Sequence, residues 1–159
     1  MEPLGQHNIK LVDDAIREGR LTRNHKGVET LDPMQALILY KLAWVTADYP
    51  LSAKAKEGGE MPRVYKRGWL ALARELGMTL PEPGDEIEII GNEPRIPKRE
   101  LVAVQRISKT VKKLEEAGFI KCLRKGSAQK RNNAVWLLTI GDPEENAEVE
   151  RYVRAHMYL

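Results

Sequence analysis

The feature that most constrains the fold is a row of apolar residues in the second half of the chain. The row consists of Leu101, Val104, Ile107, Val111 and Leu114. Residues spaced three and four apart lie on one side of an α-helix, so the row predicts a helix over residues 99–118 with a polar outer face. Gly118 stands where helices commonly end in the left-handed conformation. Two runs of β-forming residues follow, one beginning at Phe119 and one over residues 134–140, and they predict a β-hairpin.

Basic side chains are concentrated in the same part of the sequence. Residues 98–131 contain eleven Lys and Arg against three Glu, a net charge of +8, although the whole chain carries only +3. The rest of the chain is therefore acidic overall. Positive charge gathered on an acidic body is typical of a nucleic-acid-binding surface, whereas a lysine-rich helix taken alone is commonly just a solvated face. The order of helix, glycine and basic hairpin favours the first interpretation.

The length and composition of the chain predict one domain. The helices and strands expected along it predict a mostly helical α+β protein. A short helix is expected over residues 8–18, followed over residues 20–29 by a polar linker or an arm that touches DNA. Asp32 and Pro33 predict the start of a helix, because Asp caps free amides and Pro suits the first helical position. That helix is apolar nearly all round, so we expect it at the centre of the core.

The next segment predicts a loop and a second helix. Residues 52–63 have loop composition, and residues 67–76 predict a shorter helix that ends at Gly77. Tyr65 lies between basic residues, as the nucleophile of a DNA-cleaving enzyme could. No pair of His residues stands near it to hold a metal, so we interpret Tyr65 as an aromatic anchor of the fold.

Residues 78–97 form a Pro-rich, acidic segment between the two helices of this region. The segment carries five Asp or Glu against one Arg. Alternating acidic and apolar residues over 86–90 predict an edge strand with one packed face, and Gly91 and Asn92 predict a turn after it. Negative charge repels phosphate, so we expect the segment to point away from DNA and to meet a protein partner. A plain surface loop is the alternative.

The C-terminal residues predict one more helix, which starts at Asp142 and Pro143. Its apolar residues are more numerous than a short terminal helix needs. Two interpretations stay open. The helix either forms a homodimer interface or packs against its own domain.

Motifs of catalysis and cofactor binding are missing from the sequence. The three His are scattered without metal-ligand spacing, and there is no Gly-rich phosphate loop or Gly-x-Ser-x-Gly motif. We therefore expect no metal, no cofactor and no enzymatic activity. Cys122 is the only cysteine, so an internal disulfide is impossible. The sequence shows no signal peptide and no apolar run long enough to span a bilayer, so we expect a cytoplasmic protein.

Several of these features together resemble the winged-helix superfamily. They are the helix from Asp32, the helix from Arg67, the sequence Val-Lys-Lys-Leu-Glu-Glu-Ala-Gly-Phe-Ile over residues 111–120, and the basic hairpin. The 111–120 sequence is similar to the end of the recognition helix in MarR-like regulators and in phage and plasmid winged-helix proteins. Such proteins usually join the two helices of the helix-turn-helix by a tight turn. Here residues 78–97 form an insertion at that point.

The resemblance implies a DNA-binding protein in three parts. They are an N-terminal helix and arm (1–29), a winged-helix domain (30–141) and a C-terminal helix (142–159). Helix 99–118 would lie in the major groove, and the loop 124–133 would form a wing on the backbone or the minor groove. The expected DNA-binding residues are Arg99, Ala103, Gln105, Arg106, Lys109, Lys112, Lys113, Arg124, Lys125, Ser127, Gln129, Lys130, Arg131 and Asn132.

Base reading and backbone contact fall to different residues in this interpretation. Arg106 is the best candidate to contact guanine and Gln105 to contact adenine, because these side chains match those base edges. Lys130 and Arg131 are the best candidates for contacts made by the wing. The expected function is a transcription regulator that binds a palindromic site. The alternatives are a replication or recombination initiator of a phage or plasmid, and a protein-interaction module.

Overall fold

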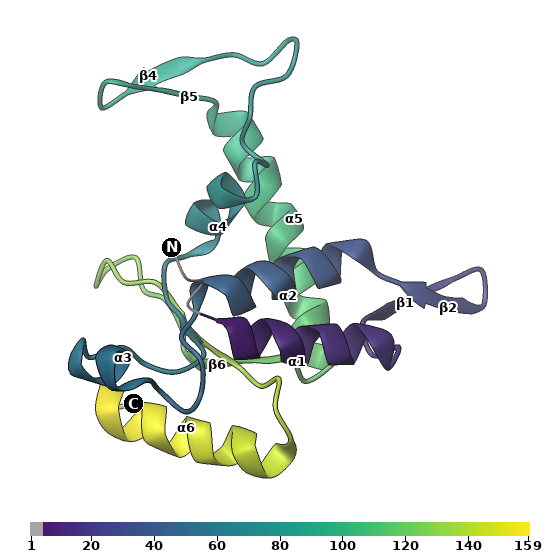
Figure 1. Ribbon diagram of the computed structural model, residues 1–159. Helices are drawn as coiled ribbons and strands as arrows, with labels where there is room; N and C mark the ends of the chain where they lie inside the picture. Colours follow the sequence, from purple (N-terminus) through teal and green to yellow (C-terminus); the bar gives the residue numbers. More distant parts are fainter. Residues whose placement is uncertain (1–4) are drawn as a thin grey trace.

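A computed structural model describes residues 5–159 of the chain. Within these residues the fold is α+β, with six helices and small antiparallel sheets (Figure 1). The helices are α1 (Gln6–Arg17), α2 (Pro33–Val45), α3 (Ala53–Glu57), α4 (Trp69–Glu75), α5 (Pro97–Glu116) and α6 (Pro143–Met157). The strands are β1 (Thr22–His25), β2 (Val28–Leu31), β3 (Val64–Tyr65), β4 (Glu88–Ile90), β5 (Glu93–Arg95), β6 (Ile120–Arg124) and β7 (Val135–Leu138). The first four residues of the predicted N-terminal segment lie outside the described residues.

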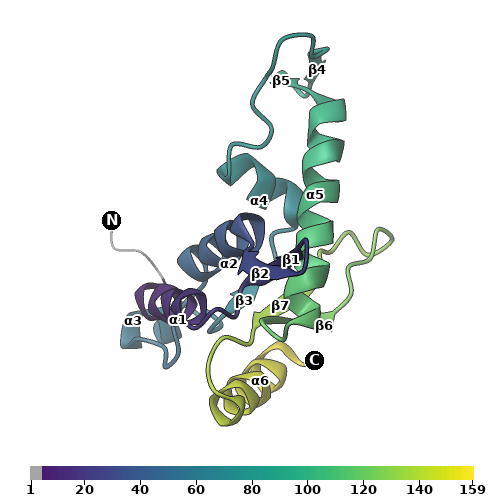
Figure 2. The same ribbon diagram turned by 90° about the vertical axis from the view of Figure 1, so that its right-hand side faces the viewer.

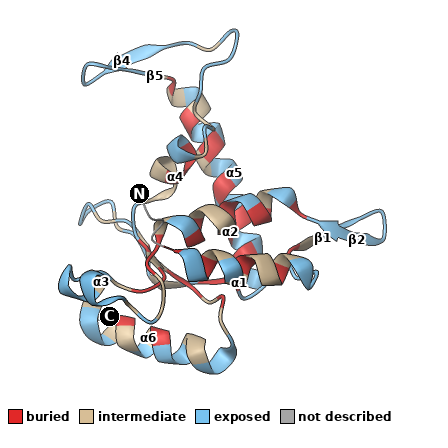
Figure 3. Cartoon of the chain, in the orientation of Figure 1, coloured by how far each residue is buried: buried red, intermediate tan, exposed pale blue. Residues whose placement is uncertain are grey.

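Helix α2 lies at the centre of the core, as predicted. The Asp32 carboxylate accepts hydrogen bonds from the backbone N–H of Met34 and Gln35, and Pro33 occupies the first turn. Helix α1 packs along α2 (Figure 1). Buried segments of α1, α2 and α5 face the middle of the molecule in Figure 3. The fully buried apolar residues of α2 are Ile38, Leu39, Leu42 and Ala43.

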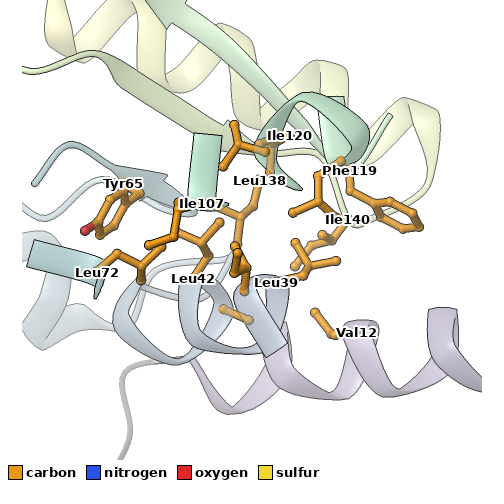
Figure 4. Packing of buried hydrophobic residues seen from close by; sticks show 14 of the residues in the cluster. Val12, Leu39, Leu42, Tyr65, Leu72, Ile107, Phe119, Ile120, Leu138 and Ile140 are labelled. Atoms are coloured by element: carbon orange, nitrogen blue, oxygen red, sulfur yellow. The ribbon is translucent and has the colours of Figure 1, made fainter. Parts of the chain in front are cut away.

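The main sheet has the strand order β3, β7, β6, with antiparallel pairing throughout. The hairpin of β6 and β7 is confirmed, whereas the sequence did not predict β3. In Figure 4 the side chains of Ile107 from α5, Leu42 from α2 and Leu138 from β7 point toward one another. Gly118 ends the helix before the sheet with φ of +85°, as predicted. Helix α5 is thus held between α2 and the hairpin that follows it.

Arg63 is completely buried, an uncommon position for a charged side chain. Its Nε donates to Asn8 Oδ1 of α1 at 2.9 Å, and its Nη1 lies 2.6 Å from Glu145 Oε1 of α6. Its backbone N–H donates to the carbonyl of Ala47, and its carbonyl accepts from the N–H of Leu138. One residue therefore joins α1, the segment after α2, the main sheet and α6.

Helix α6 packs against its own chain, the second of the two interpretations. Val149 and Val153 are buried in a small cluster with Leu137 of β7. Asp142 caps the helix by accepting from the N–H of Glu145, so the predicted start is confirmed. These contacts use the apolar side of α6 within one molecule.

Three predictions about loops and faces were wrong. Residues 20–29, expected as a linker or as an arm that touches DNA, contain β1 and part of β2, so the linker interpretation was wrong. The expected loop over 52–63 contains α3. Leu101 is 58% exposed although Glu100 and Ala103 near it are buried, so Leu101 lies off the buried face of α5. The buried side of α5 instead includes Ala103 and Thr110.

Loss of Glu145 should destabilise the protein more than loss of the Arg63 charge. In Glu145→Ala the guanidinium stays buried without a carboxylate, which costs about 3 kcal/mol. In Arg63→Met a side chain of similar length remains and the partly exposed Glu145 becomes hydrated, so we expect a loss of about 1–2 kcal/mol. Urea unfolding of both variants measures the difference.

Glu144→Ala is the matched control for this comparison, because Glu144 lies in the same first turn and is exposed. It removes the same charge from the same helix end, and its effect should stay below about 1 kcal/mol. A larger loss for Arg63→Met than for Glu145→Ala would contradict this account of the buried ion pair.

Candidate nucleic-acid interface

Helix α5 has one buried face and one free face. Its inner face contacts α2 and α4, and it leaves the outer face open to solvent. Figure 2 shows α2 and α4 on one side of α5 and the loop between β6 and β7 projecting on the other. The outer face of α5 and this loop therefore border the same side of the molecule.

The outer face of α5 is basic from the middle of the helix onward. Arg106, Lys109 and Lys112 are exposed, and none of them has an ion-pair partner within residues 5–159. Arg106, Lys109 and Lys113 follow one another at helical spacing and form one row, with exposed Gln105 beside it. The segment from Gln105 to Lys113 is roughly 12 Å long at the helical rise per residue. It presents one amide and four cations on a rigid element.

Lys113 has a second contact besides solvent. Its Nζ lies 3.8 Å from Oδ2 of Asp32, the cap of α2. Burial tends to raise the pKa of Asp32, but hydrogen bonds from Gln35 and the charge of Lys113 outweigh burial and hold that pKa below its usual value. Lys113 is still 58% exposed, so its ammonium group remains available to a phosphate.

The loop between β6 and β7 is a shaped turn that presents cations. Backbone hydrogen bonds join Ser127 and Asn132 in both directions, and Asn132 Oδ1 accepts a further one from the N–H of Ser127 at 3.0 Å. Ser127 Oγ accepts from the N–H of Lys130. Ser127 and Asn132, both half-buried, therefore shape the turn from within. The exposed side chains at or next to the turn are Arg124, Lys125, Gln129, Lys130 and Arg131.

The base of this loop lies against the start of α4. A Cβ at Gly68 would come within 3.1 Å of Asn133 Oδ1, a tight contact, and Gly68 has φ of +82°, a conformation that strains a residue with a side chain. Trp69 of α4 stacks on Tyr65 of β3 and packs at a tilt against Trp136 of β7, with ring centroids 5.6 and 5.4 Å apart. These contacts fix the loop relative to the helix pair.

Tyr65 is an aromatic anchor, as interpreted from the sequence. Its ring is buried, and its hydroxyl donates to the carbonyl of Gly68 at 2.7 Å. Burial raises the pKa of Tyr65 to about 12. A buried, protonated hydroxyl that already donates to the backbone is poorly placed to attack DNA.

Two residues of the expected DNA-binding set are not free surface residues in the structure. Ala103 is 2% exposed and belongs to the buried side of α5, so its assignment as a DNA contact was wrong. Arg99 is 24% exposed, and its Nη2 lies 3.0 Å from Asp85 Oδ1 and 2.7 Å from Glu82 Oε2. Arg99 therefore holds the acidic insertion to α5 and is not a free cation.

Lys66 is a surface cation that the sequence analysis missed. It is exposed directly after β3 and two residues before Gly68, close to the base of the basic loop. Side-chain alternation along a strand could have predicted its exposure, because Tyr65 of β3 points inward and the next residue must point outward. Arg63, the basic residue on the other side of Tyr65, is buried and takes no part in this surface.

The acidic insertion stands at the N-terminal end of α5 (Figure 1). We call residues 78–96 the arm from here on; this segment is distinct from the N-terminal arm expected over residues 20–29. The predicted turn at Gly91 and Asn92 is confirmed, since both have positive φ and join β4 to β5. The predicted packed face of β4 is wrong, because all its residues are exposed. The free cations of α5 lie from Arg106 onward, away from the arm, apart from the exposed Lys98 beside it.

Comparison with protein-family models, with curated proteins and with solved structures yields no match for this chain. Within residues 5–159, each helix is too short or too polar to cross a membrane. The same residues contain no group of three or more His, Cys, Asp or Glu side chains placed to hold a metal ion.

Asn132→Ala should loosen the basic loop. The substitution removes the side-chain hydrogen bond to Ser127 N, so backbone order parameters of residues 127–131 should fall in NMR relaxation of the free protein. Global stability should change by less than about 1 kcal/mol, because the bond is local and close to solvent. Gln129→Ala is the matched control, since its exposed side chain has no hydrogen bond within residues 5–159. Unchanged order in Asn132→Ala would show that Asn132 does not shape the loop.

Proposed function

We propose that the chain is a double-stranded DNA-binding protein of the winged-helix type. Helix α5 lies in the major groove, and the loop between β6 and β7 contacts the backbone or the minor groove. The proposal rests mainly on one observation, that two basic elements lie on the same side of the molecule. The outer face of α5 and the basic loop border one side of the molecule, and both carry exposed cations (Figure 2).

The order of the elements supports the same proposal. Helices α4 and α5 pack against each other, and the hairpin of β6 and β7 follows α5 directly. The winged-helix resemblance implies this arrangement of a helix pair followed by a wing. An α-helix is about 10–12 Å across, which fits a major groove about 12 Å wide.

The reading segment in this proposal is the middle of α5. The arm and the paired Arg99 occupy the N-terminal end, whereas Gln105, Arg106 and Lys109 are exposed and make no ion pair within residues 5–159. Arg106 reads guanine through two parallel hydrogen bonds, and Gln105 reads adenine. Lys130 and Arg131 contact phosphates, which adds affinity without base preference.

Transcription regulation is the biological role that we propose first. A palindromic site needs two copies of the chain. Because Val149 and Val153 of α6 are buried within one molecule, a dimer formed through α6 has to use the outer side of that helix. The alternative role is a replication or recombination initiator. The arm favours that alternative, because an initiator recruits other proteins through a surface that does not bind DNA.

Arg106→Ala should flatten the preference of the protein among duplex sequences. Each bidentate base contact contributes about 1–3 kcal/mol of discrimination, and this variant removes one. Selection of binding sites from randomised duplexes, performed on the wild type and the variant, measures the preference. An unchanged preference would mean that the wrong face of α5 has been placed in the groove.

Lys130→Ala combined with Arg131→Ala should weaken binding to all duplexes by a similar factor. Each lost phosphate contact should reduce the slope of log affinity against log salt by about 0.9. Lys54→Ala with Lys56→Ala is the matched control, because both residues are exposed on α3, away from α5 and the loop (Figure 2). The control removes the same charge and should keep the wild-type slope. Equal slope changes in both double variants would contradict a specific role for the loop.

A further inference from the structure

The arm carries a hairpin that nothing in the described structure covers. Residues 86–94 are exposed without exception, so both faces of the pair β4 and β5 meet solvent. An isolated two-stranded hairpin is marginally stable in water and gains stability when a face is packed. The faces of this hairpin are therefore free to pack against another molecule.

Ion pairs fix the root of the arm to the helices. Arg95 makes two close contacts with Glu100 of α5, Nε to Oε1 and Nη2 to Oε2, each 2.8 Å long, and Arg74 of α4 lies 3.5 Å from the same carboxylate. Arg99 pairs with Asp85 at the other side of the root. Ile96 is buried between these pairs. The hairpin is thus held out from the body in a defined direction, as Figure 1 shows.

Exposed apolar side chains gather on the arm and on the adjoining turn of α5. Eleven large apolar side chains are exposed within residues 5–159, and six of them lie between positions 80 and 102. Those six are Leu80, Ile87, Ile89, Ile90, Leu101 and Val102. Val102 borders an open hollow that Glu86, Glu88 and Lys98 also line, so this turn of α5 lies beside the hairpin. Ile87 borders a second hollow with Pro94 and Ile96. Apolar residues clustered in this way mark interaction sites on protein surfaces.

The charge of the arm indicates what covers this surface. Glu86, Glu88 and Glu93 are exposed and have no ion-pair partner within residues 5–159, whereas Arg95 and Arg99 are already paired. The exposed Lys98 lies beside them, so the free carboxylates outnumber the free cation three to one. Free carboxylates repel DNA. A second copy that met the same surface would bring identical carboxylates together, which opposes a symmetric dimer through the arm.

We propose that the arm docks a different protein, one that presents apolar side chains flanked by Lys or Arg. Ile87 and Ile89, which alternate with Glu86 and Glu88 along the strand, supply the apolar contact, and Glu86 and Glu88 select a basic rim. This inference is independent of the proposed DNA binding, because it uses residues outside the basic surface of α5 and the loop.

The test is a selection of short random peptides on the full-length chain. Enriched peptides should combine apolar residues with Lys or Arg. Their affinity, measured by fluorescence anisotropy, should fall about tenfold in Ile87→Ser/Ile89→Ser. Glu86→Gln/Glu88→Gln should reduce both the affinity and its salt dependence.

Val28→Ser/Leu31→Ser is the matched control, because these residues are 60% and 48% exposed on β2 of the other exposed hairpin. This variant should bind the selected peptides like the wild type. Enrichment of acidic peptides, or equal binding to the control and the arm variants, would overturn the proposal. Self-association lost in Ile87→Ser/Ile89→Ser by sedimentation would also overturn it and assign the surface to a second copy. A fall in affinity for duplex DNA in that variant would assign the surface to DNA instead.

Discussion

The buried ion pair between Arg63 and Glu145 is the interaction on which the arrangement of the other elements depends. Removing a guanidinium from water is costly unless its charge is compensated, so the chain around Arg63 must supply hydrogen bonds from several elements at once. The side chain reaches α1 through Asn8 and α6 through Glu145, while the backbone of the same residue aligns the start of β3 with β7. A polar contact therefore fixes β3, an edge strand of the three-stranded sheet. Apolar packing fixes the rest of the sheet.

The position of the basic surface follows from that sheet. Strand β3 leads directly to Gly68 and α4, and the base of the β6 and β7 loop packs at Gly68. Helix α5 is held on its inner side by Ile107 and Leu114, so its cations lie on the side from which the loop projects (Figure 2). Strand β3 and the start of α4 thereby help to hold α5 and the following loop on one side of the molecule. A rigid surface of this kind loses little conformational entropy when it binds.

Local rules predicted a large part of the fold. The cap at Asp32, the helix end at Gly118 and the turn at Gly91 each depend on the chemistry of a few neighbouring residues, and all three are confirmed. Most of the exposed cations of the candidate surface were also predicted, because helical periodicity separates them from the apolar row. The predicted hairpin after α5 has the same origin, since its two β-runs are close in sequence.

Long-range contacts decided the features that the sequence did not reveal. The burial of Arg63 needs Asn8 and Glu145, which are 55 and 82 residues away, and no local pattern marks such a pair. Ala103 is buried and Leu101 is exposed because the two residues lie on different faces of α5, and the contacts with α2 and α4 decide which face is covered. The most direct test of the proposed function is an NMR titration of the isotope-labelled chain with a short duplex. Perturbed signals should gather at residues 105–113 and 125–131, and perturbation confined to the arm or α3, or none at all, would contradict the account.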